Sequence, residues 1–273
     1  MKILKFGGSS VANHERISNV AKIIQSYVKA GEKVAVAVSA LGGATDLLIR
    51  MGKTAAEGDS SYKLSQEAFS TRHREVVNHV IDYDKHPAIL NEIVEGHIEL
   101  SNLLQGVYLT RELTARTLDY ILSFGERSSA FILAEVLKQN GTEASYIDAR
   151  KVIKTNINYG RAKIFKEETY ANIQQMWAEA KGVPIVTGFL ASSPKGFPTT
   201  LGRGGSDYTA SILGAALDAV EIIIYTDVNG VLTADPRKVK KAFPVTTMTY
   251  AEAMEMSHFG ARVFYQPTIV PAL

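Results

Sequence analysis

Apolar residues at the start of the chain follow two different spacings. Residues 1–6 and 33–40 are short and almost continuously apolar, which is typical of strands buried on both faces of a sheet. Between them, apolar residues recur at helical spacing and predict a helix over about residues 15–29. The side chains expected to face the core are Ile17, Val20, Ile23, Ile24, Tyr27 and Val28. Strand, glycine turn, helix and strand form a βαβ unit, which predicts an α/β fold with a parallel sheet and helices on both faces.

The rest of the chain continues this alternation of helices and strands. Residues 47–134 are polar and helical in pattern, with a break at Pro87, and are expected to cover the sheet. A later helix is predicted at about residues 170–180. Further strands are predicted at 143–149, 183–189 and 221–227.

Two local signals near the end of the chain predict a turn and a helix start. Asn229-Gly230 is a strong hairpin signal because both residues tolerate a left-handed backbone. Thr249 and Glu252 have capping-box spacing, which predicts a helix that runs to about Phe259.

The overall composition is that of a soluble globular protein and narrows the classes of partner. The 30 basic and 28 acidic residues give a net charge of +2 without long runs of either sign, so neither nucleic acid nor a membrane surface is an expected partner. The chain has no cysteine, which excludes disulfides and thiolate nucleophiles and fits a reducing cytoplasm. Its six histidines lack zinc-site spacing, and no residue is assigned as a metal ligand. The amino terminus lacks the apolar segment of a signal peptide or a membrane span.

Glycine-rich or polar turns follow four of the predicted strands. In open parallel sheets the carboxyl ends of the strands meet at one edge, where ligands bind, so these turns are expected to converge. Their glycines allow close backbone approach and leave amide groups free for an anion. Neither a Walker A loop nor a Rossmann glycine motif is present. The four turns are residues 5–10, 39–45, 187–189 and 202–207.

Charged residues in or near these turns have alternative interpretations. Lys5 fits either an exposed lysine at a strand end or a point charge aimed at phosphate oxygens. Arg203 is either a solvated loop cation or a planar partner for a carboxylate. Glu126 sits in a predicted turn into a helix, where acids also occur for dipole reasons alone. Asp207 places a negative charge in a loop that otherwise suits an anion.

Seven motifs in fixed order resemble the aspartokinases of the amino acid kinase family, over nearly the whole chain. This resemblance implies a three-layer αβα sandwich with a mostly parallel central sheet. It also implies one catalytic domain over residues 1–273, with a substrate-binding lobe at about 1–195 and a nucleotide-binding lobe at about 196–273. The motifs are KFGGSSVAN (5–13), VSALGGATDLL (38–48), FGERSS (124–129), TGF (187–189), TLGRGGSDYTA (200–210), TDVNGVLTADPR (226–237) and MSHFGARV (256–263).

The activity that the resemblance implies is phosphoryl transfer from ATP to the side-chain carboxylate of L-aspartate. The product would be 4-phospho-L-aspartate, in the first step of lysine, threonine and methionine biosynthesis. Mg²⁺ would be held mainly by the ATP phosphates. The resemblance also implies a cytoplasmic enzyme whose full-length parent is a homodimer. Aspartokinases continue into ACT regulatory domains, which are expected to be absent from this chain.

The resemblance also assigns site residues by motif position. Lys5 and Asp207 form the implied catalytic pair, in which Lys5 contacts phosphate oxygens and Asp207 holds the lysine. Glu126 would face the substrate amino group and Arg203 a substrate carboxylate. The implied aspartate pocket consists of Ser39, Thr45, Glu126, Phe189, Arg203, Gly204, Gly205 and Ser206. The implied ATP site consists of Lys5, Phe6, Gly7, Gly8, Ser9, Thr226, Asp227, Leu232, Arg237, Arg262 and Val263.

Several positions depart from the usual family pattern. Ser9 replaces a threonine and keeps the hydroxyl, whereas Leu232 replaces a tyrosine and loses a ring. Arg262 stands for a lysine and Gln266 for an arginine. Two other functions stay open at this point. One is a non-catalytic nucleotide or anion sensor, and the other is a different family kinase such as glutamate 5-kinase or carbamate kinase.

Overall fold

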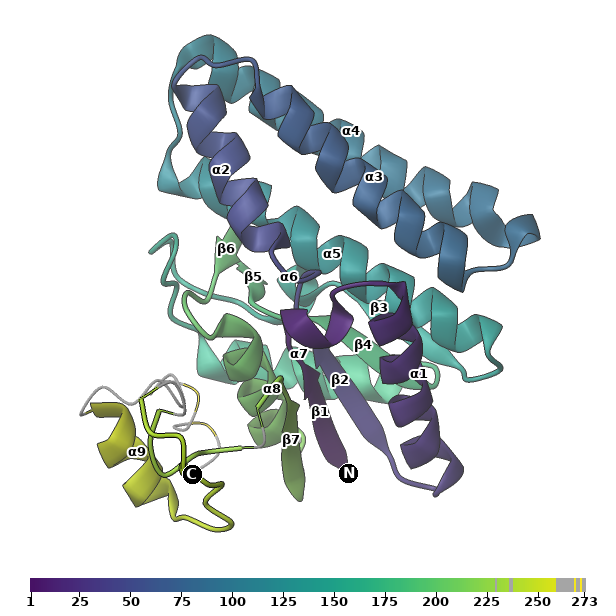
Figure 1. The fold of residues 1–273 in the computed structure, drawn as a ribbon, viewed down its shortest axis with the longest axis vertical. Helices are drawn as coiled ribbons and strands as arrows, with labels where there is room; N and C mark the ends of the chain where they lie inside the picture. Colours follow the sequence, from purple (N-terminus) through teal and green to yellow (C-terminus); the bar gives the residue numbers. More distant parts are fainter. Residues whose placement is uncertain (229, 236–237, 259–267, 269–270, 272–273) are drawn as a thin grey trace.

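Five parallel strands form the central sheet in the computed structural model, which describes all residues except 229, 236–237, 259–267, 269–270 and 272–273 (Figure 1). Their order across the sheet is β3-β4-β2-β1-β7, and every neighbouring pair is parallel. The three strands β1, β2 and β4 are almost fully buried, as their continuous apolar runs predict. The sheet consists of β1 (Lys2–Phe6), β2 (Val34–Val38), β3 (Ala144–Ile147), β4 (Val183–Thr187) and β7 (Glu221–Tyr225).

Helices cover both faces of this sheet and complete three layers (Figure 1). Helices α1 (His14–Lys29) and α5 (Ala115–Gln139) pack on one face, and α8 (Gly205–Ala216) packs on the other with α7 (Lys166–Glu179) beside it. The predicted three-layer α/β fold is confirmed, with an all-parallel central sheet. The described part of the chain contains no helix long and apolar enough to span a bilayer.

Side-chain alternation along β1 determines which layer each of its residues faces. Leu4 and Phe6 belong to the core on the α1 and α5 side, whereas Ile3 belongs to the core on the α7 and α8 side. Because side chains alternate along a strand, Lys5 shares the face of Ile3 and points toward α8. This register brings the lysine to the helix that contains Asp207.

The long helical segment forms a layer of its own. Only α5 packs extensively on the sheet, against β2, β3 and β4, whereas α2, α3 and α4 pack mainly on α5 and on one another. The expectation that the whole of residues 47–134 covers the sheet is therefore wrong. Pro87 does mark a break, because it lies in the first turn of α4. These helices are α2 (Ala44–Ala56), α3 (Tyr62–Val80) and α4 (His86–Thr110), and the short helical segments elsewhere are η1 (Gly8–Val11), η2 (Tyr83–Lys85) and α6 (Ala149–Val152).

Two local features differ from the sequence interpretation, and a third lies partly outside the described residues. Val28 was expected to face the core but is 37% exposed, and the last buried residue of α1 is Ile24. An antiparallel hairpin of β5 (Leu190–Ser192) and β6 (Pro198–Thr200) was not expected. Asn229 of the predicted hairpin turn lies outside the described residues, and further along the chain Leu232 forms an isolated antiparallel bridge with Pro244.

The predicted capped helix near the end of the chain is confirmed. Helix α9 (Tyr250–His258) begins directly after Thr249. The Glu252 amide donates to the Thr249 hydroxyl at 3.2 Å, and the Thr249 amide donates to the Glu252 carboxylate at 2.7 Å. This reciprocal pair is the capping box that the spacing predicts.

Two buried histidines between α3 and α4 predict acid sensitivity. The His73 Nδ1–H donates to the Phe69 carbonyl at 2.8 Å, and its ring packs edge-on against His97 at 5.3 Å. Burial lowers the pKa of His73 to about 3 and that of His97 to about 4, and nearby positive charges act in the same direction. The unfolded chain therefore binds protons that the folded chain does not, and stability falls as the pH drops below about 6.5 and levels off near the folded pKa values.

We expect His73 alone to cost about 2–3 kcal/mol of unfolding free energy at pH 4.5 relative to pH 7. Urea unfolding at both pH values measures this loss, and His73→Phe should reduce it because the variant has no proton to gain. If the unfolding free energies of wild type and variant fall in parallel with pH, the buried histidine does not cause the acid sensitivity.

Candidate active site

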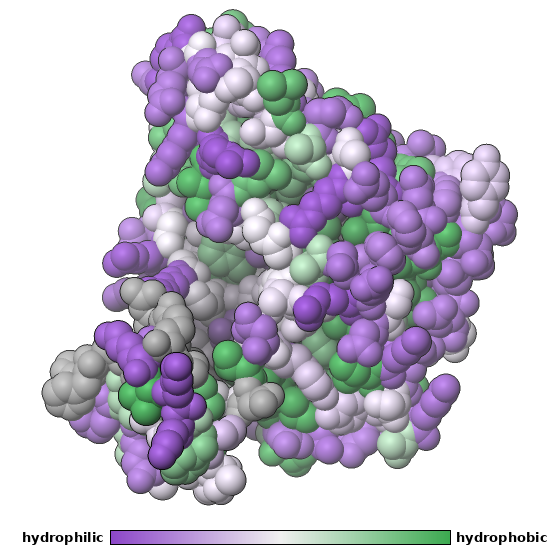
Figure 2. Space-filling model, viewed as in Figure 1, coloured by the Kyte–Doolittle hydropathy of each residue, from purple (hydrophilic) through white to green (hydrophobic). Residues whose placement is uncertain are grey.

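A cavity of about 690 Å³ lies at the carboxyl ends of the strands. The surface is visibly hollowed between α2 and α8 (Figure 2). All four predicted turns contribute to its wall, as the shared direction of parallel strands requires. The predicted site residues that line it are Lys5, Gly8, Ser39, Thr45, Glu126, Phe189, Arg203, Gly204, Gly205, Ser206 and Asp207.

Lys5 and Asp207 form an ion pair in this wall. The Lys5 Nζ lies 2.7 Å from the Asp207 Oδ1, and the side chains are 10% and 30% exposed. The interpretation of Lys5 as an exposed lysine is therefore wrong, and the expected proximity of Asp207 is present. A Cβ at Gly7 would lie 3.2 Å from the Lys5 Nζ, so a glycine there leaves room around the ammonium group. A largely buried cation held this way has its remaining N–H donors available for an anion.

The glycine turn before α8 presents Arg203 and the first amides of the helix. Gly202 and Gly204 have φ values of +79° and +68°, which side chains rarely adopt. The Gly205 amide donates to the Gly202 carbonyl at 3.0 Å and closes the turn. Arg203 is exposed and makes no ion pair with another described residue. Free amides at a helix start and an unpaired guanidinium together suit a carboxylate or a phosphate.

Phe189 packs against this turn in a strained conformation. Its φ of +67° is unusual for a residue with a side chain. The Phe189 amide donates to the Thr209 hydroxyl at 3.0 Å, and that hydroxyl donates to the Gly205 carbonyl at 3.0 Å. A Cβ at Gly205 would lie 2.6 Å from the Phe189 ring, so ring and turn are in direct contact. Such strain persists where surrounding contacts fix it, typically at functional sites.

Glu126 lies within α5 and not in the turn that the sequence suggested. Gly125 is a residue type typical of turns, but here it lets α5 pass close to the turn that follows β2, since a Cβ there would lie 2.8 Å from the Ala40 Cβ. Glu126 is 3% exposed, and its Oε2 has no hydrogen-bond partner among the described residues. Burial raises the pKa of this carboxyl to about 8, while the Ala40 amide acts to lower it. A buried carboxyl with one oxygen free beside a cavity is suited to an ammonium group.

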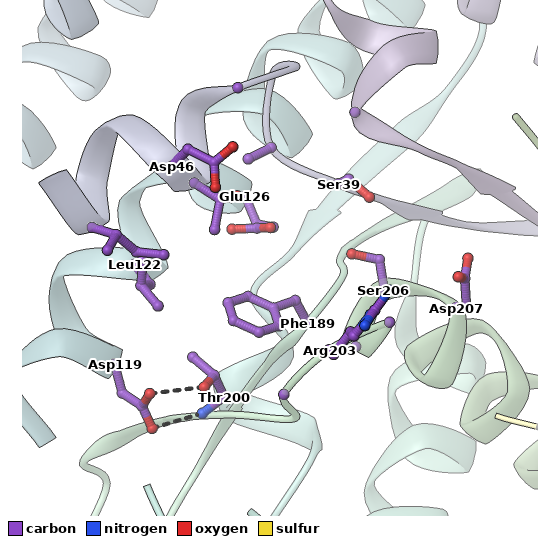
Figure 3. A pocket seen from close by; sticks show the side chains of 18 of the residues that line it. Ser39, Asp46, Asp119, Leu122, Glu126, Phe189, Thr200, Arg203, Ser206 and Asp207 are labelled. Carbon is purple, nitrogen blue, oxygen red and sulfur yellow. Dashed lines mark hydrogen bonds between the residues drawn. The ribbon is translucent and has the colours of Figure 1, made fainter. Parts of the chain in front are cut away.

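Sequence reasoning missed several residues that line the cavity, among them Asp46, Asp119, Leu122 and Thr200. Asp119 accepts two hydrogen bonds from Thr200, and Figure 3 draws both of them. It lies seven residues before Glu126, so both share one face of α5. That spacing is visible in the sequence once residues 115–139 are taken as a single helix.

The structure describes most, but not all, of the residues predicted to bind ATP. Thr226 and Asp227 directly follow β7, as expected, and the Thr226 hydroxyl donates to the Asp227 carboxylate at 3.1 Å. Phe6 is fully buried and stacks on Tyr225 at 4.7 Å, so only its backbone is available to a ligand. Arg237, Arg262 and Val263 lie outside the described residues. Within the described part, no group of three or more histidine, aspartate or glutamate side chains is arranged to hold a metal.

The sequence family follows from a match over almost the whole chain. The model of the amino acid kinase family matches residues 1–272. The chain belongs to the amino acid kinase family. Within this family it is 38% identical to aspartokinase 1 from Arabidopsis thaliana chloroplasts and 34% identical to the lysine-sensitive aspartokinase 3 of Escherichia coli, over 99% of this chain in both cases. The resemblance to aspartokinases that the seven motifs indicate is thereby confirmed.

Solved structures of this family agree with the sequence comparison. Escherichia coli aspartokinase III, in complex with aspartate and ADP, superposes with a TM-score of 0.90 at 33% identity and covers 100% of this chain. The chain spans 59% of that structure, 59% of the Escherichia coli sequence and 48% of the Arabidopsis sequence. The chain thus corresponds to part of these longer proteins.

Proposed function

We propose that this protein is an aspartate kinase, which transfers the γ-phosphoryl group of ATP to the side-chain carboxylate of L-aspartate. The observation that carries the proposal is the Lys5–Asp207 ion pair in a cavity that also contains Glu126 and Arg203. Glu126 comes from α5 and Arg203 from the turn before α8, so the ammonium and a carboxylate of one amino acid would meet different walls (Figure 3). The Escherichia coli structure with aspartate and ADP supports the same pair of ligands.

In this reaction Lys5 would neutralise charge. The nucleophile is a carboxylate with a reference pKa of about 3.9, so it is already ionised at neutral pH and needs no general base. The obstacle is repulsion between that anion and the phosphates, and phosphoryl transfer depends mainly on positioning and charge neutralisation. Asp207 would keep the Lys5 ammonium aimed at the phosphates, and the glycine amides before α8 would bind the substrate carboxylate.

Mg²⁺ would accompany ATP as its phosphate-bound counterion. The metal keeps most of its water ligands and needs few protein oxygens, which fits a wall that presents a lysine and backbone amides. When bound, it would reduce the negative charge of the phosphates that the substrate carboxylate must approach. The role of this chain is to hold the substrate carboxylate and the lysine in fixed positions.

Further parts of the proposal concern the cellular context. We place the reaction at the start of lysine, threonine and methionine biosynthesis, and the enzyme in the cytoplasm, which suits a chain without cysteine. The plant relatives are chloroplastic, so the compartment differs within the family. We also propose that the enzyme forms a homodimer.

Aspartate-dependent release of ADP tests the proposed reaction. We expect ADP release with L-aspartate and Mg²⁺, and little with glutamate, carbamate or no acceptor. A nucleotide sensor would bind ATP without any acceptor-dependent ADP release. Faster turnover with glutamate or carbamate would assign the protein to another branch of the family.

A further inference from the structure

Asp119 connects the two walls of the cavity. Its side chain is on α5, two turns before Glu126, and the residue is 1% exposed. The Asp119 Oδ2 accepts from the Gly160 amide at 2.9 Å and from the Thr200 amide at 3.0 Å, and its Oδ1 accepts from the Thr200 hydroxyl at 2.7 Å. Both oxygens are thus bound to neutral donors on two other segments of the chain.

These two segments form the base of the turn that presents Arg203. Thr200 ends β6, and the next amide, from Leu201, donates to the Phe189 carbonyl at 2.9 Å. Gly160 lies against the same turn, since a Cβ at Gly202 would be 3.0 Å from the Gly160 carbonyl oxygen. Asp119 therefore fixes both sides of the base from which the glycine turn projects.

We propose that Asp119 is a positioning residue that sets the separation between Arg203 and the α5 wall, and so determines affinity for the amino acid substrate. An amino acid that spans from Glu126 to Arg203 needs both partners at a fixed separation. Asp119 lies seven positions before Glu126 on α5, which corresponds to a rise of about 10 Å. One rigid helix therefore carries Glu126, which would bind the substrate ammonium group, and Asp119, which holds the turn of Arg203. This inference rests on the proposed function for the identity of the substrate, but not for the tether itself.

The hydrogen bonds also specify which substitutions should be tolerated. An asparagine at position 119 can accept both backbone amides with its oxygen and donate its NH₂ group to the Thr200 hydroxyl, so it keeps the three contacts without the charge. An alanine loses all of them and leaves two amides without acceptors. Asp148 is a suitable control because it is also a buried carboxylate, but it caps α6 and pairs with Arg150 at 2.6 Å.

The test compares Asp119→Ala, Asp119→Asn and Asp148→Ala in steady-state kinetics. We expect Asp119→Ala to raise the KM for aspartate by about 10- to 100-fold, because small misplacements of binding groups are costly. The KM for MgATP should change less than about twofold, and Asp119→Asn should stay within about threefold of wild type. Asp148→Ala should lower the melting temperature without a change in the KM for aspartate.

A second readout does not depend on turnover. In Asp119→Ala, amide exchange at Gly160 and Thr200 and tryptic cleavage after Arg203 should both become faster, because the turn loses its tether. If Asp119→Ala does not fold, Thr200→Val removes one of the three bonds and should shift the same readouts less.

Three results would overturn the inference. They are an unchanged KM for aspartate in Asp119→Ala, an equal rise for aspartate and MgATP, or an Asp119→Asn variant as impaired as the alanine. If wild type neither binds nor phosphorylates aspartate, the proposed function fails. The exchange and cleavage rates then test only whether Asp119 holds the turn in place, and unchanged rates would refute that role.

Discussion

Replacing Lys5 by alanine should lower turnover by at least about 10²- to 10³-fold, because a preorganised charge that stabilises phosphoryl transfer is lost. The Lys5 Nζ lies in the cavity wall, 2.7 Å from the Asp207 Oδ1. The fold should survive, because Asp207 is partly exposed and water can solvate its carboxylate once the lysine is gone. Measurement of kcat and of both KM values separates a loss of catalysis from a loss of binding.

Lys2→Ala is the matched control for Lys5→Ala. Lys2 lies on the same strand but at its other end, where it pairs with Glu32 at 3.0 Å and with Glu221 at 3.6 Å. This variant should keep near-normal turnover, because neither pair lines the cavity. Near-normal turnover of Lys5→Ala would contradict the assignment of the lysine, and equal losses in both variants would indicate a general effect of altered charge on β1.

The convergence of the glycine turns could be predicted because it follows from backbone geometry. Parallel strands share one direction, so turns at their carboxyl ends meet without any knowledge of packing. The orientation of Lys5 follows in the same way from the alternation of Ile3, Leu4 and Phe6 between two cores. These features depend on periods that are present in the sequence itself.

The location of Glu126 could not be predicted from its neighbours. Ser-Phe-Gly-Glu has the composition of a turn, and only the close approach of Gly125 to Ala40 explains a glycine inside α5. That approach depends on how α5 packs against the sheet, which no local pattern encodes. Asp119 was missed for the same reason, because its relation to Glu126 requires a continuous helix between them.

The β5–β6 hairpin was missed for a different reason. Its strands are only three residues long and too short to show alternation. The sequence between them, Pro194-Lys195-Gly196, does have the composition of a turn, and Gly196 has a φ of +80°. This turn signal was the only local evidence for the hairpin that positions Thr200 beside Asp119.

Glu126→Gln should raise the KM for aspartate by about 10- to 100-fold, which corresponds to the loss of one hydrogen bond to a charged group. In wild type, burial raises the pKa of Glu126 to about 8, so the empty site is largely protonated at neutral pH and must ionise to bind an ammonium group. The value of kcat/KM for aspartate should therefore rise up to tenfold per pH unit from pH 6 and level off near pH 8, and this rise should be absent in the glutamine variant.

The same carboxyl should make the folded protein less stable as the pH rises. The folded pKa lies above the unfolded value of 4.5, so the carboxyl destabilises wild type increasingly between pH 4.5 and 8, and the melting temperature of Glu126→Gln should exceed that of wild type more at pH 8 than at pH 5. A stable variant with weak aspartate binding would thus separate recognition from folding, whereas an unchanged KM would remove Glu126 from the binding site.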